Sequence, residues 1–76
     1  MGKKGEETRA LIREKALLLF AQKGFDGVTM KDICLATGLS RGGLYRHYES
    51  TRQIFSEILE LMLDAQRQEF SEKISF

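Results

Sequence analysis

Apolar residues recur along the first third of the chain with the spacing of one face of a helix. At positions i, i+4, i+7 and i+8 stand Ile12, Ala16, Leu19 and Phe20. This period of about 3.6 residues predicts an amphipathic helix over about residues 6–23, preceded by a flexible polar arm at residues 1–5. Gly24 is placed to end the helix in a left-handed cap. We expect Phe25 to fold back as an apolar plug.

Two shorter helices around a glycine are predicted over residues 29–48, TMKDICLATGLSRGGLYRHY. Thr29 and Asp32 have the spacing of a capping box at the start of the first of these helices. Gly38 is expected to end it, because a residue with a side chain would be strained there at positive φ. Ser40 is expected to cap the second short helix.

The last predicted helix is more apolar than a surface helix needs to be. Ser50 is expected to cap it, with Gln53 completing a second capping box. At 100° per residue its apolar side chains spread over an arc of roughly 200°, whereas a stripe of about 100° covers a core. These residues are Ile54, Phe55, Ile58, Leu59, Leu61, Met62 and Leu63. We expect one part of the arc to pack on the preceding helices and the rest to lack a partner within this chain.

No proline, no strand-like alternation and no internal repeat occurs in the 76 residues. The predicted fold class is therefore all-α: a three-helix, homeodomain-like helix-turn-helix bundle followed by a long fourth amphipathic helix. The expected division is an arm at residues 1–5, a helix-turn-helix domain at 6–49 and the fourth helix at 50–76.

Composition excludes several classes of protein. One cysteine and no cluster of metal ligands leave neither a disulfide nor zinc to hold the fold. No apolar run approaches the ~18 residues that span a membrane, and no signal-peptide pattern is present, so we expect a cytoplasmic protein. The net charge of +1 is unevenly divided, with ten Lys/Arg against six Asp/Glu in residues 1–52 and two against five in residues 53–76. The basic first part fits a polyanionic partner, and an ordinary solvated surface is the alternative explanation of this charge.

The second short helix carries residues suited to the major groove of double-stranded DNA. In a helix-turn-helix, the first residues of the second helix face base edges. Here they are Ser40, Arg41, Gly42, Gly43 and Arg46. Arg41 can donate two hydrogen bonds to guanine. Gly42 and Gly43 each cost about 0.8–1 kcal/mol of helix stability against alanine, which close approach either to DNA or to a neighbouring helix would explain.

Other polar residues of the motif are candidates for contacts that set the register on DNA. Tyr45 and His47 can donate to phosphate oxygens, although Tyr45 also fits a half-buried core aromatic and His47 a solvated surface residue. Lys31 is available for a phosphate or a base edge. Leu44 and Tyr48 are four residues apart and are expected to face the core.

With these residues in place, the chain resembles the N-terminal DNA-binding domain of the TetR/AcrR family of transcriptional repressors over about residues 8–60. The matching residues are Thr8-Arg9, Ile12, Ala16, Phe20, Gly24-Phe25, Thr29-Met30, Asp32-Ile33, Ala36, Gly38-Leu39-Ser40, Gly43-Leu44-Tyr45 and His47-Tyr48-Glu49-Ser50. The resemblance implies a homodimeric repressor that binds a palindromic operator. A small-molecule inducer would bind a C-terminal ligand-binding and dimerisation domain, of which residues 50–76 would hold only the connecting helix and the start.

The resemblance also implies roles for individual residues. Lys31, Arg41 and Gly43 would lie near bases, and Thr29, Tyr45 and His47 near phosphates. The family usually carries lysine after the serine that corresponds to Ser50, and that lysine meets the DNA backbone. Here Thr51 stands at this position, so either Thr51 donates a neutral hydrogen bond or Arg52 substitutes. Gly43 stands where the family often has Thr, Ala or Ser, so a side-chain contact is lost there.

Family members are much longer than 76 residues, so we expect this chain to be a piece of a longer protein, monomeric or weakly self-associating on its own. The alternative is a small helical interaction module that works through the apolar face of the fourth helix. An enzyme with a catalytic or cofactor site is not expected, since His47 has no carboxylate at helical spacing to orient it. Cys34, on the inner face of a helix, is interpreted as a small core residue and not as a redox sensor.

Overall fold

The computed structural model describes residues 3–74, and the side chains of residues 5–66. Within this part the chain forms four α-helices and one 3-10 turn, with no strand. They are α1 (Lys3–Lys23), η1 (Phe25–Gly27), α2 (Met30–Thr37), α3 (Arg41–His47) and α4 (Thr51–Ile74). The predicted all-α fold class, with a helix-turn-helix unit and a long fourth helix, is confirmed.

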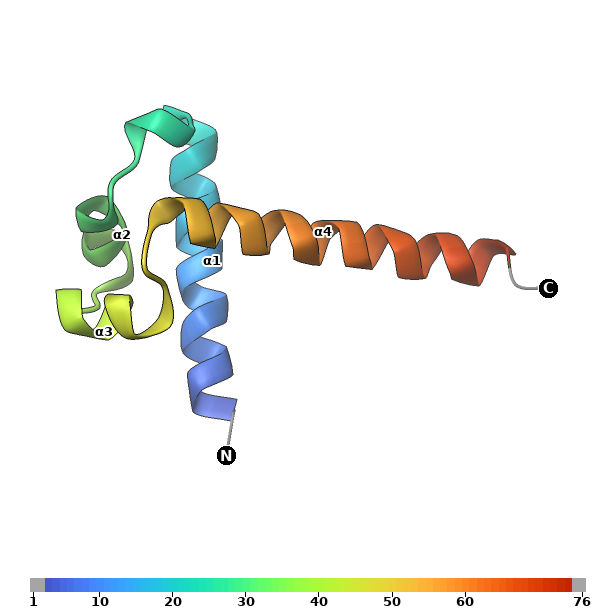
Figure 1. The fold of residues 1–76 in the computed structure, drawn as a ribbon, viewed down its shortest axis with the longest axis horizontal. Coiled ribbons are helices and arrows are strands. Elements are labelled where there is room, and N and C mark those ends of the chain that lie inside the picture. Colours follow the sequence, from blue (N-terminus) through green and yellow to red (C-terminus); the bar gives the residue numbers. More distant parts are fainter. Residues whose placement is uncertain (1–2, 75–76) are drawn as a thin grey trace.

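Helix α1 is the centre of the arrangement (Figure 1). The short helices α2 and α3 lie on one side of it, and α4 crosses it and continues well past the other three helices. Because α1 packs against both α2 and α4, it fixes the helix-turn-helix unit relative to the start of α4. The far half of α4 has no neighbouring helix in the described part of the chain.

The core is built from the apolar positions that the helical period indicates. Its buried side chains come from every helix and from the loop before α2. They are Ile12, Ala16, Phe20, Val28, Ile33, Leu44, Tyr48, Ile54 and Ile58. Leu19 of the predicted first face is only partly buried at the edge of this core. The predicted inward positions Leu44 and Tyr48 are confirmed, at 0% and 1% exposure.

Three phenylalanines close the end of the core where α1 meets α4. The Phe25 ring centroid lies 5.6 Å from that of Phe20 and 5.2 Å from that of Phe55. The Phe20 and Phe55 rings meet edge to face at 5.3 Å, a favoured geometry for aromatic pairs. Phe25 therefore folds back onto the core as predicted.

Two glycines adopt positive φ where the chain leaves a helix. Gly38 has φ 78° and ψ 4°, the left-handed conformation predicted for the end of α2, and its amide donates to the Cys34 carbonyl at 2.9 Å. Gly24 also has positive φ, 80°, but its ψ is 162°. The prediction of a left-handed helical cap at Gly24 is therefore wrong in ψ, because the chain turns directly into η1 there.

The start of α1 also differs from expectation. The helix begins at Lys3, three residues before the predicted start at Glu6, so part of the expected arm is helical. Residues 1 and 2 of that arm lie outside the described residues. No helix in the described part is long and apolar enough to cross a membrane.

The predicted N-caps of α2 and α3 are confirmed. Thr29 Oγ1 accepts from the Asp32 amide at 3.2 Å, and an Asp32 carboxylate oxygen accepts from the Thr29 amide at 3.0 Å, which completes the capping box. The backbone hydrogen bond from Thr29, with Lys23 Nζ 4.0 Å away, holds the pKa of Asp32 below its ordinary value. Ser40 Oγ accepts from the Gly43 amide at 3.0 Å.

The cap of α4 differs in one bond from the predicted capping box. Ser50 Oγ accepts from the Gln53 amide at 3.2 Å, as predicted. The Gln53 side chain does not return to the Ser50 amide; it accepts from the Glu49 amide at 2.6 Å instead. The amide group of Gln53 thus reaches one residue further back and fixes the link between Tyr48 and α4.

The apolar arc of α4 is divided as its width predicts. Ile54 and Ile58 are buried in the core, and Phe55 packs at its edge. Beyond them Leu61 and Leu63 are exposed by 45% and 56%, and Leu59 and Met62 are similarly exposed. The second half of the arc therefore has no partner within the part of the chain whose side chains are described.

Candidate nucleic-acid interface

The turn between α2 and α3 is held by side-chain and backbone hydrogen bonds. Thr37 Oγ1 donates to the Ile33 carbonyl at 2.8 Å and accepts from the Leu39 amide at 3.3 Å. Leu39 packs against the core, and Gly38 supplies the left-handed residue. The role of Thr37 was not predicted, although a threonine one residue before a helix-ending glycine is well placed to hold such a turn.

Helix α3 is oriented by its buried face. Leu44 and Tyr48 point into the core, so the opposite side of this seven-residue helix faces away from the domain. On that side Arg41, Gly42 and Arg46 are exposed, and Tyr45 is 41% exposed. The side chains predicted to face a partner therefore point away from the domain, while Leu44 and Tyr48 hold the helix against the core.

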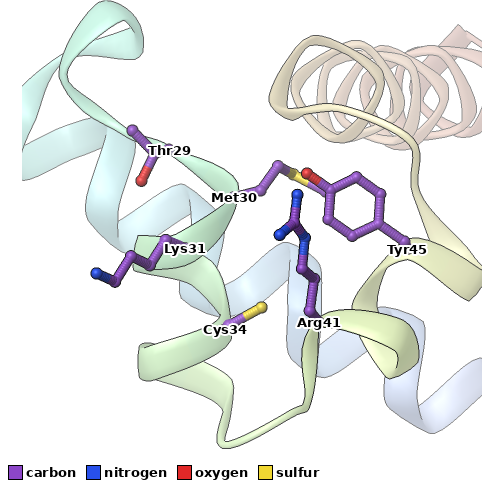
Figure 2. Close-up of a pocket in the computed structure, with 6 residues that line it drawn as sticks. All are labelled: Thr29, Met30, Lys31, Cys34, Arg41 and Tyr45. Atoms are coloured by element: carbon purple, nitrogen blue, oxygen red, sulfur yellow. The ribbon is translucent and has the colours of Figure 1, made fainter.

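An open cavity of about 550 Å³ lies between the start of α2 and the outward face of α3. Figure 2 shows the side chains that line it: Thr29, Met30, Lys31, Cys34, Arg41 and Tyr45. Four of these six, Thr29, Lys31, Arg41 and Tyr45, were predicted as candidate DNA-binding residues. Cys34 was interpreted as a core residue, and neither it nor Met30 was predicted to line a cavity.

Cys34 lies at the border between the core and the open cavity. It is partly buried and packs against the core, as expected for a small apolar residue. It also lines the open cavity beside Arg41 (Figure 2). The interpretation as an interior residue is therefore only half correct, because α2 is short and its Cys34 side lies at the border of the core.

The two glycines of α3 differ in their surroundings. A Cβ atom at Gly42 would meet nothing within 4 Å, so packing inside the domain does not require glycine there. A Cβ atom at Gly43 would lie 3.2 Å from Ser40 Oγ, the atom that caps the helix. Of the two explanations that sequence left open, close approach to a neighbouring helix is excluded for Gly42 among the described residues.

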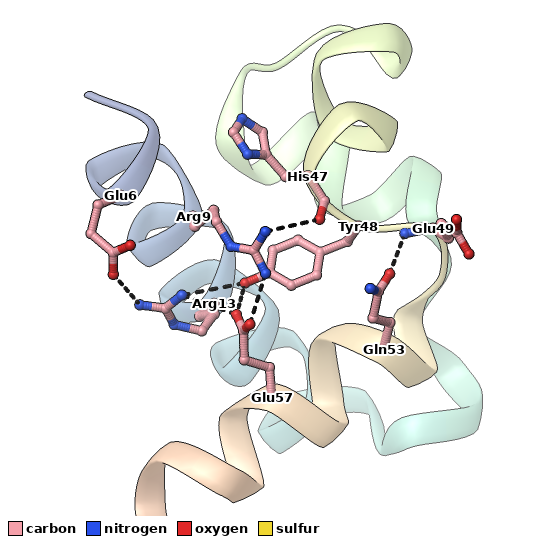
Figure 3. A network of polar contacts seen from close by, with 8 residues as sticks. All are labelled: Glu6, Arg9, Arg13, His47, Tyr48, Glu49, Gln53 and Glu57. Atoms are coloured by element: carbon pink, nitrogen blue, oxygen red, sulfur yellow. Dashed lines mark hydrogen bonds and ion pairs between the residues drawn. The ribbon is translucent and has the colours of Figure 1, made fainter. Parts of the chain in front are cut away.

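The remaining predicted residues lie at the two ends of α3 and in the first turn of α4. Ser40 is exposed at the start of α3 and is engaged in its cap. His47 is half-buried at the end of α3, and its ring points away from α4 in Figure 3. Thr51 is half-buried in the first turn of α4, whereas Arg52 beside it is exposed.

Three cations of α1 differ in their partners from the exposed candidate cations. Arg9, Arg13 and Lys23 of α1 each lie within 4.0 Å of a carboxylate. No such ion pair within the described side chains involves the exposed candidate cations, which are Lys31, Arg41, Arg46 and Arg52. The Arg41 guanidinium instead lies over the Tyr45 ring, 5.6 Å from its centroid. The positive charge of the candidate surface is therefore largely uncompensated.

Behind α3 lies a polar network that sequence reasoning missed (Figure 3). The Glu57 carboxylate accepts from Arg9 at 2.7 Å, from Arg13 at 3.1 Å and from the Tyr48 hydroxyl. Burial by itself would raise the pKa of Glu57, but the hydrogen bonds from Tyr48, Arg9 and Arg13 outweigh it and lower that pKa. Burial, together with the hydrogen bond to Glu57, raises the pKa of Tyr48.

One signal in the sequence points toward this network. Arg9 and Arg13 stand four residues apart, next to the buried position Ile12, so both lie along the edge of the core-facing stripe of α1. Their partner Glu57 is 44 to 48 residues away, and no local pattern connects such distant positions.

Comparison with known proteins agrees with this geometry. The family model described as bacterial regulatory proteins, tetR family, matches residues 12–58, which include the buried core and the whole helix-turn-helix unit. An uncharacterised helix-turn-helix (HTH) transcriptional regulator of Bacillus subtilis, YfiR, is 42% identical over 59 residues, covering 78% of this chain and 29% of the relative.

Two further relatives carry more specific names. The HTH-type transcriptional regulator AcrR of Shigella flexneri is 41% identical over 74% of this chain and 26% of the relative. The HTH-type transcriptional repressor KstR2 of Rhodococcus jostii is 40% identical over 83% of this chain and 30% of the relative. The chain thus spans less than a third of the length of these relatives. Because the family model covers more than half of its residues, this chain belongs to the TetR family of bacterial regulatory proteins.

Proposed function

We propose that this chain binds double-stranded DNA sequence-specifically, as the operator-reading domain of a TetR-like transcriptional repressor. Membership of the family implies DNA-binding transcriptional regulation. The single observation that carries the finer proposal is the set of exposed cations on the outward face of α3 and at the start of α2. Arg41 lines the cavity together with Lys31, Arg46 is exposed on α3, and none of the three makes an ion pair within 4.0 Å among the described side chains. Unpaired cations on an exposed helix are suited to phosphates and to the acceptor atoms of guanine.

In this proposal base recognition rests on few side chains. Arg41, Arg46 and Lys31 contact base edges, and Gly43 lets the backbone lie near them. Gly42 supports the proposal because it is exposed and has open space where a side chain would be. Ser40, which caps α3, sets the start of the helix at the groove.

Phosphate contacts flank this centre. Thr29 at the start of α2, and Tyr45 and His47 on α3, are the proposed donors to the DNA backbone. At the start of α4 the donor is Arg52 rather than Thr51, because Arg52 is exposed and cationic whereas Thr51 is half-buried. These contacts set the register of the domain on DNA and carry no sequence information directly.

The intact protein is proposed to be a homodimer on a palindromic operator, released by a small-molecule inducer that binds a C-terminal domain. The relatives AcrR and KstR2 are more than three times as long as the segment they share with this chain, which leaves room for such a domain. The exposed apolar residues of α4 within 59–63 are suited to pack against such a domain. The alternative, an interaction module acting through α4 alone, has less support, because the family match includes the whole helix-turn-helix unit.

A mobility-shift titration at several salt concentrations tests DNA binding. A duplex selected by this chain from a random-sequence pool is the probe, and a scrambled duplex of equal length and composition is the control. The binding constant K falls as salt rises, and each phosphate contact is expected to make the slope of log K against log salt more negative by about 0.9. The selected duplex should bind more tightly than the scrambled one at every salt concentration. Equal binding to both duplexes, or no binding to either, would contradict the proposal.

A further inference from the structure

Arg9 joins three elements at one point. One of its guanidinium nitrogens, Nη1, donates to the carbonyl oxygen of His47, the last residue of α3, at 3.3 Å. The other, Nη2, lies 2.7 Å from Glu57 Oε1 on α4. The guanidinium carbon lies 4.4 Å from the ring centroid of Tyr48, which follows α3. A single side chain of α1 thus holds the end of α3 and the second turn of α4 (Figure 3).

Glu57 is the acceptor that makes this junction possible. Its two carboxylate oxygens receive Arg9, Arg13 and the Tyr48 hydroxyl. The Glu57 side chain is 27% exposed, so its charge is partly removed from water and its hydrogen bonds are charge-assisted. From α4, Glu57 thus contacts both α1 and Tyr48, the residue that follows α3.

Helix α3 needs support of this kind. It has seven residues, two of them glycine, and so has low helix stability of its own. Leu44 buries the middle of the helix, and Ser40 caps its start. The opposite end is held by the Arg9 bond to His47 and by the packing of Tyr48 against Arg9.

We propose that Arg9 and Glu57 are positioning residues for DNA recognition. They contact no DNA; they hold the C-terminal end of α3 against α1 and α4, so that Arg41 and Arg46 meet the groove in one orientation. This inference rests on the proposed function. It assigns sequence discrimination in part to a network on the protected side of the recognition helix.

For Glu57→Gln, the change in charge and the positioning role predict opposite changes in DNA affinity. Glu57→Gln removes a negative charge from the domain, which would by itself strengthen binding to any DNA. The positioning role predicts weaker binding to the selected duplex despite that gain. Glu60→Gln is the matched control, because Glu60 lies on the same helix, is exposed, and makes no ion pair within the described part of the chain.

A second variant keeps the net charge unchanged. Arg9→Lys retains one positive charge but replaces the planar fork by a single ammonium group, which cannot reach the His47 carbonyl, stack on Tyr48 and pair with Glu57 in the same way. If Glu57→Gln fails to fold, Arg9→Lys still tests the proposal.

The experiment measures the affinity ratio between the duplex selected by the unchanged chain and its scrambled control. Circular dichroism at the assay temperature establishes that each variant is folded. Glu57→Gln and Arg9→Lys are expected to lower the ratio by about tenfold, the loss of one well-placed base contact, with little loss on scrambled DNA. Glu60→Gln is expected to leave the ratio unchanged.

Two results would overturn the inference while leaving the proposed function intact. In one, Glu57→Gln and Glu60→Gln are indistinguishable on both duplexes and Arg9→Lys matches the unchanged chain. In the other, folded variants lose affinity equally for selected and scrambled DNA, which indicates a general structural role. If the unchanged chain shows no preference between the duplexes, the proposed function itself fails, and the inference fails with it.

Discussion

The guanidinium group of Arg41 lies over the ring of Tyr45, 5.6 Å from its centroid, on the exposed face of α3. The two residues are one helical turn apart, so the ring restricts the side chain that we propose reads guanine. The pair also lines the cavity between α2 and α3 (Figure 2). A base-reading side chain held in this way loses less conformational freedom on binding.

Replacing Arg41 by alanine is expected to relax base preference. Loss of a bidentate contact to guanine should cost about 1–3 kcal/mol on the selected duplex and much less on a scrambled one. Lys15→Ala on α1 removes the same charge outside the candidate interface and serves as the control. Mobility shifts on both duplexes measure the effect. Equal losses for Arg41→Ala and Lys15→Ala would show that only charge matters at position 41.

Tyr45→Phe is expected to weaken binding to all sequences by a similar factor. The substitution removes the hydroxyl proposed to donate to a phosphate but retains the ring beneath Arg41. A hydrogen bond from a hydroxyl to a charged phosphate contributes about 1.5–3 kcal/mol. The same two duplexes report the result, and the affinity ratio between them should stay constant. A change in the ratio would mean that the hydroxyl orients Arg41 or contacts a base.

Gly42→Ala is expected to change stability and DNA affinity in opposite directions. A Cβ atom there meets nothing within 4 Å, so alanine should raise the free energy of unfolding by up to about 1 kcal/mol through helix propensity. The same methyl group would separate α3 from the DNA and weaken binding. Urea denaturation and mobility shifts measure the two quantities. A variant that is more stable and binds equally well would remove Gly42 from the interface.

Gly43→Ala is the comparison for that experiment. Its Cβ would lie 3.2 Å from Ser40 Oγ, so the cap of α3 must shift to make room. The gain in helix propensity is therefore expected to be reduced or lost at position 43. In urea denaturation, the two neighbouring glycines thus separate the stability gained from helix propensity from the stability lost to crowding at the cap.

The local features of this fold could be predicted, whereas its long-range polar contacts could not. Thr29, Ser40 and Gly38 act through hydrogen bonds and dihedral angles within a few residues, so sequence spacing determines them. The 3.6-residue period predicted which side of α3 is buried. The contacts of Glu57 could not be predicted from sequence spacing, because only the crossing of α1 and α4 brings its partners on α1 close to it.

The candidate site shows the same division. Lys31 and Arg41 were predicted as candidates from the helix-turn-helix pattern, and both line the cavity. Met30 and Cys34 were missed as lining residues because a short helix at the edge of a core exposes one side of its inner face. For Gln53 the wrong donor was predicted, because its side-chain oxygen accepts from the amide of Glu49, one residue before the Ser50 amide that the capping box predicts.

The network at Glu57 is expected to make stability depend on pH at both extremes. The folded-state pKa of Glu57 is lowered, so its stabilising contribution is present above the unfolded value of about 4.3 and is lost as pH falls through the lower folded value. The folded-state pKa of Tyr48 is raised, so its contribution is present below about 10 and is lost as pH rises through the higher folded value.

Thermal unfolding across pH tests the acid limb of this prediction. Asp32, whose pKa is also lowered, contributes in the same direction, so the informative comparison is between Glu57→Gln and Glu60→Gln. The midpoint temperature of Glu57→Gln should fall less steeply than that of Glu60→Gln between about pH 5 and pH 2. Parallel curves for the two variants would show that Glu57 gives up no stabilising contact on protonation.

The exposed apolar residues of α4 give the last prediction, which separates DNA binding from the interaction module. Leu61 is 45% exposed and lies beyond the buried positions Ile54 and Ile58, so Leu61→Asp should alter the midpoint of unfolding little. DNA binding by this chain should persist in Leu61→Asp and be lost on charge reversal at Arg41 and Arg46. Sedimentation of the unchanged chain is expected to show a monomer or weak association at micromolar concentration. A tight dimer that Leu61→Asp dissociates, with DNA binding unaffected by charge reversal, would establish α4 as the working surface of this chain instead.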